Sequence, residues 1–374
     1  MVKTYLKYLR IGRPTLVTIS VSLVVLTVAD HVMFQSALFR HQNGIFSIAN
    51  FTRDSNSQLA VVSFLSFSAE GPVECTFKCI GEPQCLSFNL AIHPDSDGLY
   101  RCDLLPIDKY RARQMDFQAS DVFHHYSPWS TCQPTHCQNG SCIPDFQMDT
   151  YYCLCQPGFA GDRCQRKGKS CSEIKYHSPQ TTSGSYVIDP DGDGGYQPFT
   201  VFCNMADKNG VGVTVIGHDS EDRTHVTGYE PIGSYVRRVH YLGEGITNVP
   251  QIAFLTDVST HCEQFIKYEC RGCFIFRGDT AWWMSRTLTK MTYWGGATPA
   301  DHNKCACGVT SPNSCADPSR GCNCDKSDGT WDEDSGLLTE KSHLPVLQLK
   351  FGDTGGSSEE GYHTLGKFKC YGME

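Results

Sequence analysis

The sequence predicts a multi-module, disulfide-rich fold in which small β and α+β modules follow one another along the chain. The 374 residues contain 21 cysteines, and none occurs before Cys75. They fall into three blocks of 4, 6 and 11, which indicates three separately cross-linked units. Glycine, proline and aromatic residues are plentiful, whereas charged residues make up only 19% of the chain. A coiled coil or a long disordered tail is therefore not expected.

The amino terminus predicts export from the cytosol. Four basic residues lie within the first 13 positions, and an uncharged run over 15–29 follows them. This order is typical of a signal peptide over 1–29, cleaved after Ala29. The run would span about 23 Å as a helix, which is less than the hydrocarbon core of a bilayer. The alternative is a type II signal anchor that extends to Phe34 and leaves the protein in the plasma membrane. Either interpretation places the cysteines outside the cell, in a secreted or membrane-anchored protein.

The first cysteine block predicts a helix cross-linked to a sheet. Cys75 and Cys79 stand four residues apart, which places both thiols on one face of a helix, and Cys85 begins a strand-like stretch. The pattern resembles the PAN/apple module over residues 45–127. That resemblance implies an α+β module with disulfides Cys75–Cys102 and Cys79–Cys85.

The second block resembles an EGF-like module over residues 128–165. Its six cysteines are separated by 4, 4, 10, 1 and 8 residues. The resemblance implies a small β module with the disulfides Cys132–Cys142, Cys137–Cys153 and Cys155–Cys164. Calcium-binding members carry an acidic residue shortly before the first cysteine, and 124–131 contains none, so no calcium is expected here.

The third block predicts one domain over residues 171–374. Its opening, 183–205, resembles the start of fibrinogen-like domains and, as closely, of fibrillar collagen C-propeptides. The motifs HCEQ, YEC, AWW, TYWGG, KCACG and GCNCD then follow in the order found in the fibrinogen-like module of contactin-associated (neurexin IV-type) adhesion proteins. That resemblance implies an α+β domain rich in short strands, with Cys171 paired to Cys203. Strands are expected over 211–216, 251–255 and 346–351.

Cysteine pairing within 262–370 is left open by the sequence. Cys273 is the extra residue that makes the total odd. It is either a free buried thiol or a link to another chain, which would make an oligomer.

Aromatic residues predict a candidate ligand-binding group in this domain. Trp282, Trp283, Tyr293 and Trp294 form the densest aromatic cluster of the chain. If exposed, they could stack on sugar rings or anchor a protein partner. The alternative is that at least half of them belong to the core, because a domain of this size must bury its large side chains.

Three further patterns suggest chemistry or modification. Asp189, Asp191 and Asp193 resemble half of a calcium loop, although a plain turn explains them better. GDTGG at 352–356 resembles a protease nucleophile loop, but Thr354 replaces the serine and no histidine loop precedes it. Asn50 and Asn139 begin N-glycosylation acceptor triplets.

These observations favour a non-catalytic extracellular adhesion or recognition protein. Its ligand would be a cell-surface protein, a matrix component or a glycan, bound through the fibrinogen-like head. The second hypothesis is a secreted, fibrinogen-related lectin-like protein, with calcium as an assisting ion, and the third is an enzyme with an unrecognised site. The net charge of -8 argues against nucleic acid as a partner, because phosphate binding requires positive charge.

Overall fold

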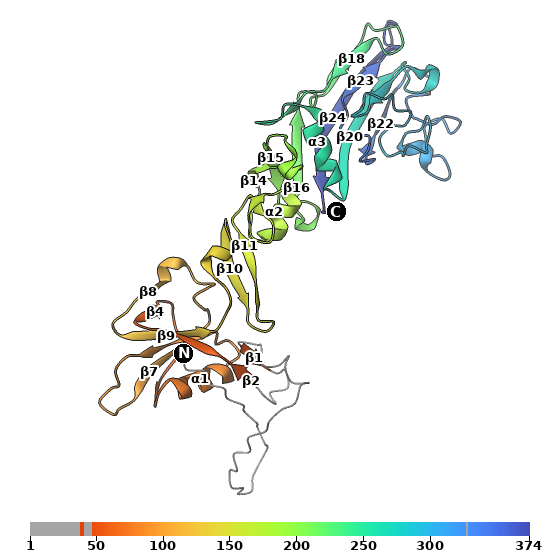
Figure 1. Ribbon diagram of the computed structural model, residues 1–374. Helices are drawn as coiled ribbons and strands as arrows, with labels where there is room; N and C mark the ends of the chain where they lie inside the picture. Colours follow the sequence, from red (N-terminus) through yellow and green to blue (C-terminus); the bar gives the residue numbers. More distant parts are fainter. Residues whose placement is uncertain (1–37, 41–46, 327) are drawn as a thin grey trace, which may run out of the picture. The chain divides into compact units, whose positions relative to one another are not determined.

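The computed structural model describes residues 38–40, 47–326 and 328–374 (Figure 1). The predicted signal peptide or anchor therefore lies outside the described residues. Within them, no helix combines the length and the apolar character needed to cross a membrane. The chain forms two compact units, which meet in the sequence between Leu154 and Cys155. Each unit is described by itself.

The N-terminal unit is built around a five-stranded antiparallel sheet. Its spatial order is β3-β9-β6-β7-β5. The strands are β3 (Phe51–Asp54), β9 (Phe123–Pro128), β6 (Ser87–Ala91), β7 (Tyr100–Leu105) and β5 (Leu65–Ala69). Two ribbons accompany it, namely β1 (Leu38–Arg40) with β2 (Ser47–Ala49), and β4 (Ser57–Leu59) with β8 (Phe117–Ala119) beside the short helix η2 (Gln114–Asp116).

Helix α1 (Pro72–Gly81) is fixed to this sheet by disulfides. Proline at its start and Glu74 in its first turn favour helix initiation there. The i,i+4 spacing turns Cys75 and Cys79 into the core, where Cys75 bonds to Cys102 of β7 and Cys79 bonds to Cys85. These are the pairs that the sequence resemblance implied.

The EGF-like segment consists of short hairpins held by disulfides. Its elements are η3 (Pro134–His136), β10 (Gly140–Asp145), β11 (Thr150–Cys155), β12 (Phe159–Ala160) and β13 (Arg166–Lys167). The disulfides are Cys132–Cys142, Cys137–Cys153 and Cys155–Cys164, as the resemblance implied. At the β10–β11 turn, Phe146 is only 8% exposed because it packs against side chains of the preceding module, namely Phe51, Ile80, Leu86 and Tyr110.

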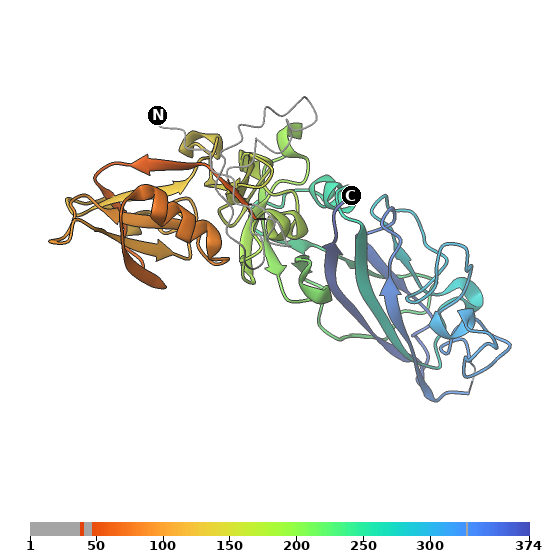
Figure 2. The ribbon, with the colours of Figure 1, turned by 90° about the horizontal axis from the view of Figure 1, so that it is seen from below.

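The C-terminal unit contains an eight-stranded antiparallel sheet. Its main path runs β14-β15-β16-β24-β20-β22, with β17 on β24 and β19 on β16. The two longest strands, β20 (His261–Arg271) and β24 (Glu360–Tyr371), lie side by side, in teal and dark blue in Figure 2. The others are β14 (Gly184–Ile188), β15 (Phe199–Asn204), β16 (Val213–His218), β17 (Thr224–Val226), β19 (Tyr241–Leu242) and β22 (Trp331–Leu338).

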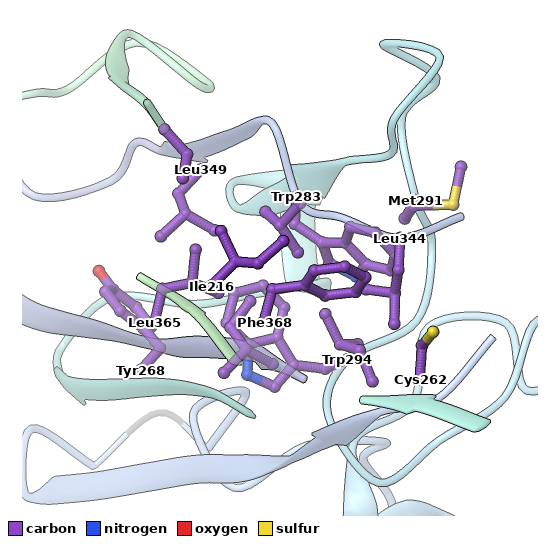
Figure 3. Close-up of a cluster of buried hydrophobic side chains, with 14 of the residues drawn as sticks. Ile216, Cys262, Tyr268, Trp283, Met291, Trp294, Leu344, Leu349, Leu365 and Phe368 are labelled. Carbon is purple, nitrogen blue, oxygen red and sulfur yellow. The ribbon is translucent and has the colours of Figure 1, made fainter. Parts of the chain in front are cut away.

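A second, three-stranded sheet packs over one face of the large sheet. Its order is β18 (Tyr235–Arg238), β23 (Gln348–Phe351) and β21 (Trp282–Met284). The core between the two layers contains Trp283, Leu349, Leu365 and Phe368 (Figure 3). The opposite face of the large sheet carries the polar and partly exposed residues of its strands.

Few helices complete this unit. They are α2 (Cys171–His177) and α3 (Val249–Asp257), with the short helices η4 (Gly192–Gly194), η5 (Lys208–Gly210), η6 (Arg277–Asp279) and η7 (Ala306–Val309). Within the described residues, the three α-helices are short, so the protein is mainly β. The strand expected over 251–255 is wrong, because this segment belongs to α3. Asn248 caps that helix by accepting from the Gln251 backbone N–H, and the Gln251 side chain reaches back to the cap.

The disulfides of the C-terminal unit resolve the pairing that the sequence left open. Cys171 bonds to Cys203, and the remaining pairs are Cys262–Cys370, Cys270–Cys324, Cys305–Cys322 and Cys307–Cys315. Cys273 is a free thiol that is only 1% exposed, and its sulfur lies 3.3 Å from the Tyr268 hydroxyl. Its burial fits the alternative of a free buried thiol, and a link to another chain stays a prediction.

Candidate ligand-binding cleft

Three of the four aromatic residues expected to bind a ligand are core residues. Trp283 and Trp294 are fully buried and Tyr293 is 2% exposed. The Trp283 indole N–H donates to the Tyr293 carbonyl at 2.7 Å, and the Trp294 indole N–H donates to the Asp334 carbonyl at 3.1 Å. The binding prediction is therefore wrong for these three, and the core alternative holds. Only Trp282 reaches the surface, on a different face from the cleft described below.

The other predicted chemical sites are local turns. Thr354 of the GDTGG segment is fully buried, and its hydroxyl donates a hydrogen bond to the Tyr229 carbonyl at 3.3 Å. Asp191 accepts the Tyr196 backbone N–H at 3.1 Å across its turn. The side chain of Asp193 lies outside the described residues, so calcium binding at this loop stays a prediction.

The acceptor asparagines lie in the N-terminal unit. Both are partly buried: Asn50 precedes β3 and accepts the Trp129 backbone N–H through its carbonyl at 2.7 Å, whereas Asn139 lies in the turn before β10. Neither position tests whether a glycan is attached, and glycosylation stays a prediction.

The open face of the large sheet carries an ordered array of aromatic and charged side chains. Strand register aligns His225, Tyr362, Glu269 and Glu333 across β17, β24, β20 and β22. Two residues further along each strand, the same register aligns Glu360, Arg271 and Trp331. Because side chains alternate between the two faces of a strand, all of these residues lie on the face away from the core.

Aromatic rings and guanidinium groups stack within this array. The guanidinium carbon of Arg223 lies 3.3 Å from the Tyr362 ring centroid, and that of Arg271 lies 5.5 Å from the Trp331 ring. The rings of Trp331 and Tyr362 are 5.8 Å apart, and His225 stacks on Tyr362 at 4.5 Å. Trp331 is nevertheless 45% exposed. A large aromatic surface is thus held rigidly and still presented to solvent.

Ion pairs fix the charged members of the array. Arg223 contacts Glu269 at 2.8 Å and Arg271 contacts Glu360 at 2.6 Å. The hydrogen bond from Arg223 holds the pKa of Glu269 below its usual value, and the hydrogen bond to Glu333 raises the pKa of Lys267. Glu269 and Lys267 are therefore charged at neutral pH, and each cation of these ion pairs lies beside a carboxylate.

A disulfide-linked loop borders the array and turns it into a cleft. Cys270–Cys324 ties the loop over 305–324 to β20, and Cys305–Cys322 and Cys307–Cys315 cross-link it internally. The cleft between this loop and β22 has a volume of about 760 Å³. Its lining consists of Arg223, Glu269, Ser314, Ala316, Asn323, Trp331, Asp332 and Glu333.

This arrangement is suited to binding. Trp, Tyr and Arg are the residue types most enriched at the energetic centres of protein interfaces. Sequence reasoning missed Trp331 and Tyr362 because they lie 31 positions apart and neither stands in an aromatic-rich segment. The sequence does contain one signal for this face. Lys267, Glu269 and Arg271 are charged residues at every second position of a strand-like segment, a spacing that predicts one exposed face of a strand.

Taken together, the fold and the cleft define a disulfide-linked, mainly β recognition domain that follows an EGF-like module. Residues 160–368 match the fibrillar collagen C-terminal domain family, and residues 132–163 match the EGF-like domain family. The chain belongs to the fibrillar collagen C-terminal domain family, because that match covers more than half of it. Both kinds of domain are typically non-catalytic.

Curated relatives extend the similarity beyond the single domain. The chain is 31% identical to human contactin-associated protein 1 over 294 residues, which is 75% of this chain and 20% of the relative. It is 32% identical to the rat protein over 266 residues, with 70% and 18% covered. Fruit fly neurexin-4 (Drosophila melanogaster) is 34% identical over 255 residues, with 64% and 19% covered. The chain spans about a fifth of the length of these relatives. It is an extracellular multidomain protein related to contactin-associated proteins.

These matches correct two module assignments. The C-terminal domain is a fibrillar collagen C-terminal domain and not a fibrinogen-like one; of the two families that residues 183–205 resemble equally, the collagen family is supported over 160–368. The PAN/apple assignment of 45–127 is not supported either, because the matched families begin at residue 132. A helix joined to a sheet by two disulfides is a local geometry, and local geometry does not specify a family.

Proposed function

We propose that this chain is an adhesion or recognition protein whose C-terminal domain binds another cell-surface protein through the Trp331 cleft. The observation that carries the proposal is the exposed Trp331 ring, held beside Tyr362 and two arginines on a rigid sheet. Pre-organised aromatic and guanidinium groups contribute most where a partner excludes water from them.

The relatives suggest which partner to test first. The name of contactin-associated protein 1 describes association with contactin, and we extend that association to this chain as part of the proposal. A matrix component or a glycan remains within the same proposal as an extracellular ligand of the cleft. The proposal applies equally to a secreted chain and to one held by an N-terminal anchor, because the cleft lies in the C-terminal domain.

The test compares two tryptophans with similar exposure. The extracellular chain is immobilised, and binding of a contactin ectodomain is measured by surface plasmon resonance. Trp331→Ala is expected to weaken binding at least about 30-fold, which corresponds to about 2 kcal/mol. Trp129→Ala is the control, because Trp129 is 38% exposed but belongs to the N-terminal unit. Equal affinity of the Trp331 variant and the wild type, or an equal loss in the control, would contradict the proposal, as would no binding by the wild-type chain.

A further inference from the structure

The three-stranded sheet has an outer face that the cleft does not use. Register aligns Val236, Lys350 and Trp282 across β18, β23 and β21 in one row, and Arg238, Gln348 and Met284 in the next. The intervening residues, such as Trp283 and Leu349, point into the core and are fully buried. Figure 1 shows β18 and β23 side by side in this sheet. We call the outer residues of these two rows, together with Lys290, the basic face.

Trp282 organises the cations of the basic face. The Nζ atom of Lys290 lies 4.0 Å from the Trp282 ring centroid, and that of Lys350 lies 5.9 Å from it. The backbone at Gly233 packs so closely on the same ring that a Cβ there would collide with it. The ring is therefore engaged within the molecule, where it positions two ammonium groups by cation–π attraction.

Two of the three positive charges of the basic face, those of Arg238 and Lys350, lack an ion-pair partner among the described residues. Among the described residues, neither Arg238 nor Lys350 has a carboxylate within ion-pair distance. Lys290 forms an ion pair with Asp279, whose side chain is 60% exposed, so a carboxylate that solvent also reaches offsets the charge of this lysine. At the Trp331 cleft, by contrast, each arginine pairs with a glutamate. The basic face is thus a local excess of positive charge on a chain whose net charge is -8.

The chemistry of this face indicates a polyanion. Because Trp282 is only partly exposed and its ring packs against Gly233 and Lys290, it is less suited than Trp331 to insert into a pocket of a protein partner. What remains accessible is a set of cationic groups beside Val236, which is 44% exposed. The cationic groups suit an extended ligand that carries repeated negative groups. Outside the cell, anionic polysaccharides have this character. We propose that the basic face binds an anionic polysaccharide, with Arg238, Lys350 and Lys290 contacting its sulfate or carboxylate groups.

The experiment measures binding of the whole extracellular chain to heparin oligosaccharides at several salt concentrations. The wild type is expected to bind at 0.15 M salt, with affinity that falls as salt rises, because charge contacts are screened (roughly 8 Å Debye length at this salt). Arg238→Ala with Lys350→Ala removes two cationic contacts. The double variant should weaken heparin binding at least about tenfold. It should also lower the slope of log affinity against log salt by about two, because each lost contact with a phosphate group lowers such a slope by about one and we expect the same for sulfate.

A matched control and a second ligand make the outcome decisive. Arg53→Ala with Lys367→Ala removes the same charge from exposed positions outside the basic face, and it should leave heparin affinity within about twofold of the wild type. An equal loss in this control would overturn the proposal. Failure of the wild-type chain to bind heparin would also overturn the proposal. Binding of polyglutamate in place of heparin would overturn it too, because that result indicates an acidic protein partner. The Trp331 variant is tested separately, so failure here leaves the cleft proposal standing.

Discussion

The stability of the C-terminal domain should depend on the protonation of His363. This side chain on β24 is fully buried, with its ring parallel to that of Phe351 at 5.6 Å. Its Nε2 atom lies 2.9 Å from the Tyr235 hydroxyl, whereas its Nδ1 atom is buried without a hydrogen-bond partner. Burial lowers the pKa of His363 to about 4, and the charge of Arg237 contributes in the same direction. The folded protein therefore keeps a neutral imidazole where the unfolded chain carries an imidazolium ion.

The sign and the size of the effect follow from this difference. Below pH 6.5 the unfolded chain binds a proton at this histidine, and the folded chain does so only near pH 4. The free energy of unfolding must then decrease as the pH falls between these values. Between pH 7 and pH 4.5 the loss due to His363 is about 2 kcal/mol. Asp334 acts oppositely, because burial raises its pKa to about 6, so the wild-type pH dependence contains both contributions.

A variant isolates the histidine. His363→Gln keeps an amide beside Tyr235 but cannot titrate. Urea unfolding is followed by tryptophan fluorescence, which reports mainly on this domain because it holds four of the five tryptophans. Relative to the variant, the wild type should lose about 2 kcal/mol between pH 7 and pH 4.5. His125→Gln serves as the control: His125 is also buried, but it lies in the N-terminal unit. Parallel pH profiles of the wild type and His363→Gln would refute the reasoning.

Two further predictions concern cross-links and packing. Replacing Cys262 and Cys370 by alanine opens a loop of 108 residues, whose effective length the Cys270–Cys324 disulfide already reduces. The free energy of unfolding should fall by about 4 kcal/mol. Replacing Cys307 and Cys315, which are separated by 8 residues, should lower it by about 2.5 kcal/mol. Equal losses in urea unfolding would argue against loop entropy as the source. Phe146→Ala removes a buried anchor and should cost the N-terminal unit about 3 kcal/mol. Amide exchange in β10–β11 should accelerate, and unchanged protection would show that disulfides alone hold this hairpin.

Cysteine spacing predicted one module correctly, because the disulfide framework of an EGF-like domain depends on spacing more than on packing. The EGF-like module follows directly from its six cysteines, and the family match over 132–163 confirms it. The pairs within 262–370 could not be predicted, because a cross-strand pair such as Cys262–Cys370 depends on the register of β20 against β24. The fibrinogen-like assignment was wrong although the likeness to contactin-associated proteins was found, because the opening segment resembles two families equally.

Local signals failed where tertiary context or capping decided the structure. The segment 251–255 was predicted as a strand from its apolar composition, yet the cap formed by Asn248 and Gln251 begins a helix there. That signal was present in the sequence, since Asn followed by Gln three positions later is a capping pattern. The adjacent histidines 124 and 125 show the same dependence on context. They lie in β9, where alternation buries His125 completely and leaves His124 partly exposed.

The same alternation explains why aromatic density in the sequence did not locate the binding surfaces. Trp282 and Trp283 are adjacent in a strand, so they must point to opposite faces, and only one of them can be a core residue of a two-layer domain. Which one is buried depends on the pairing of β21 with β23, and the sequence does not contain that register. Trp331 and Tyr362 become neighbours only through the pairing of β22 and β24 with β20. Clustering in sequence therefore marked the core, whereas both proposed binding faces are products of strand register.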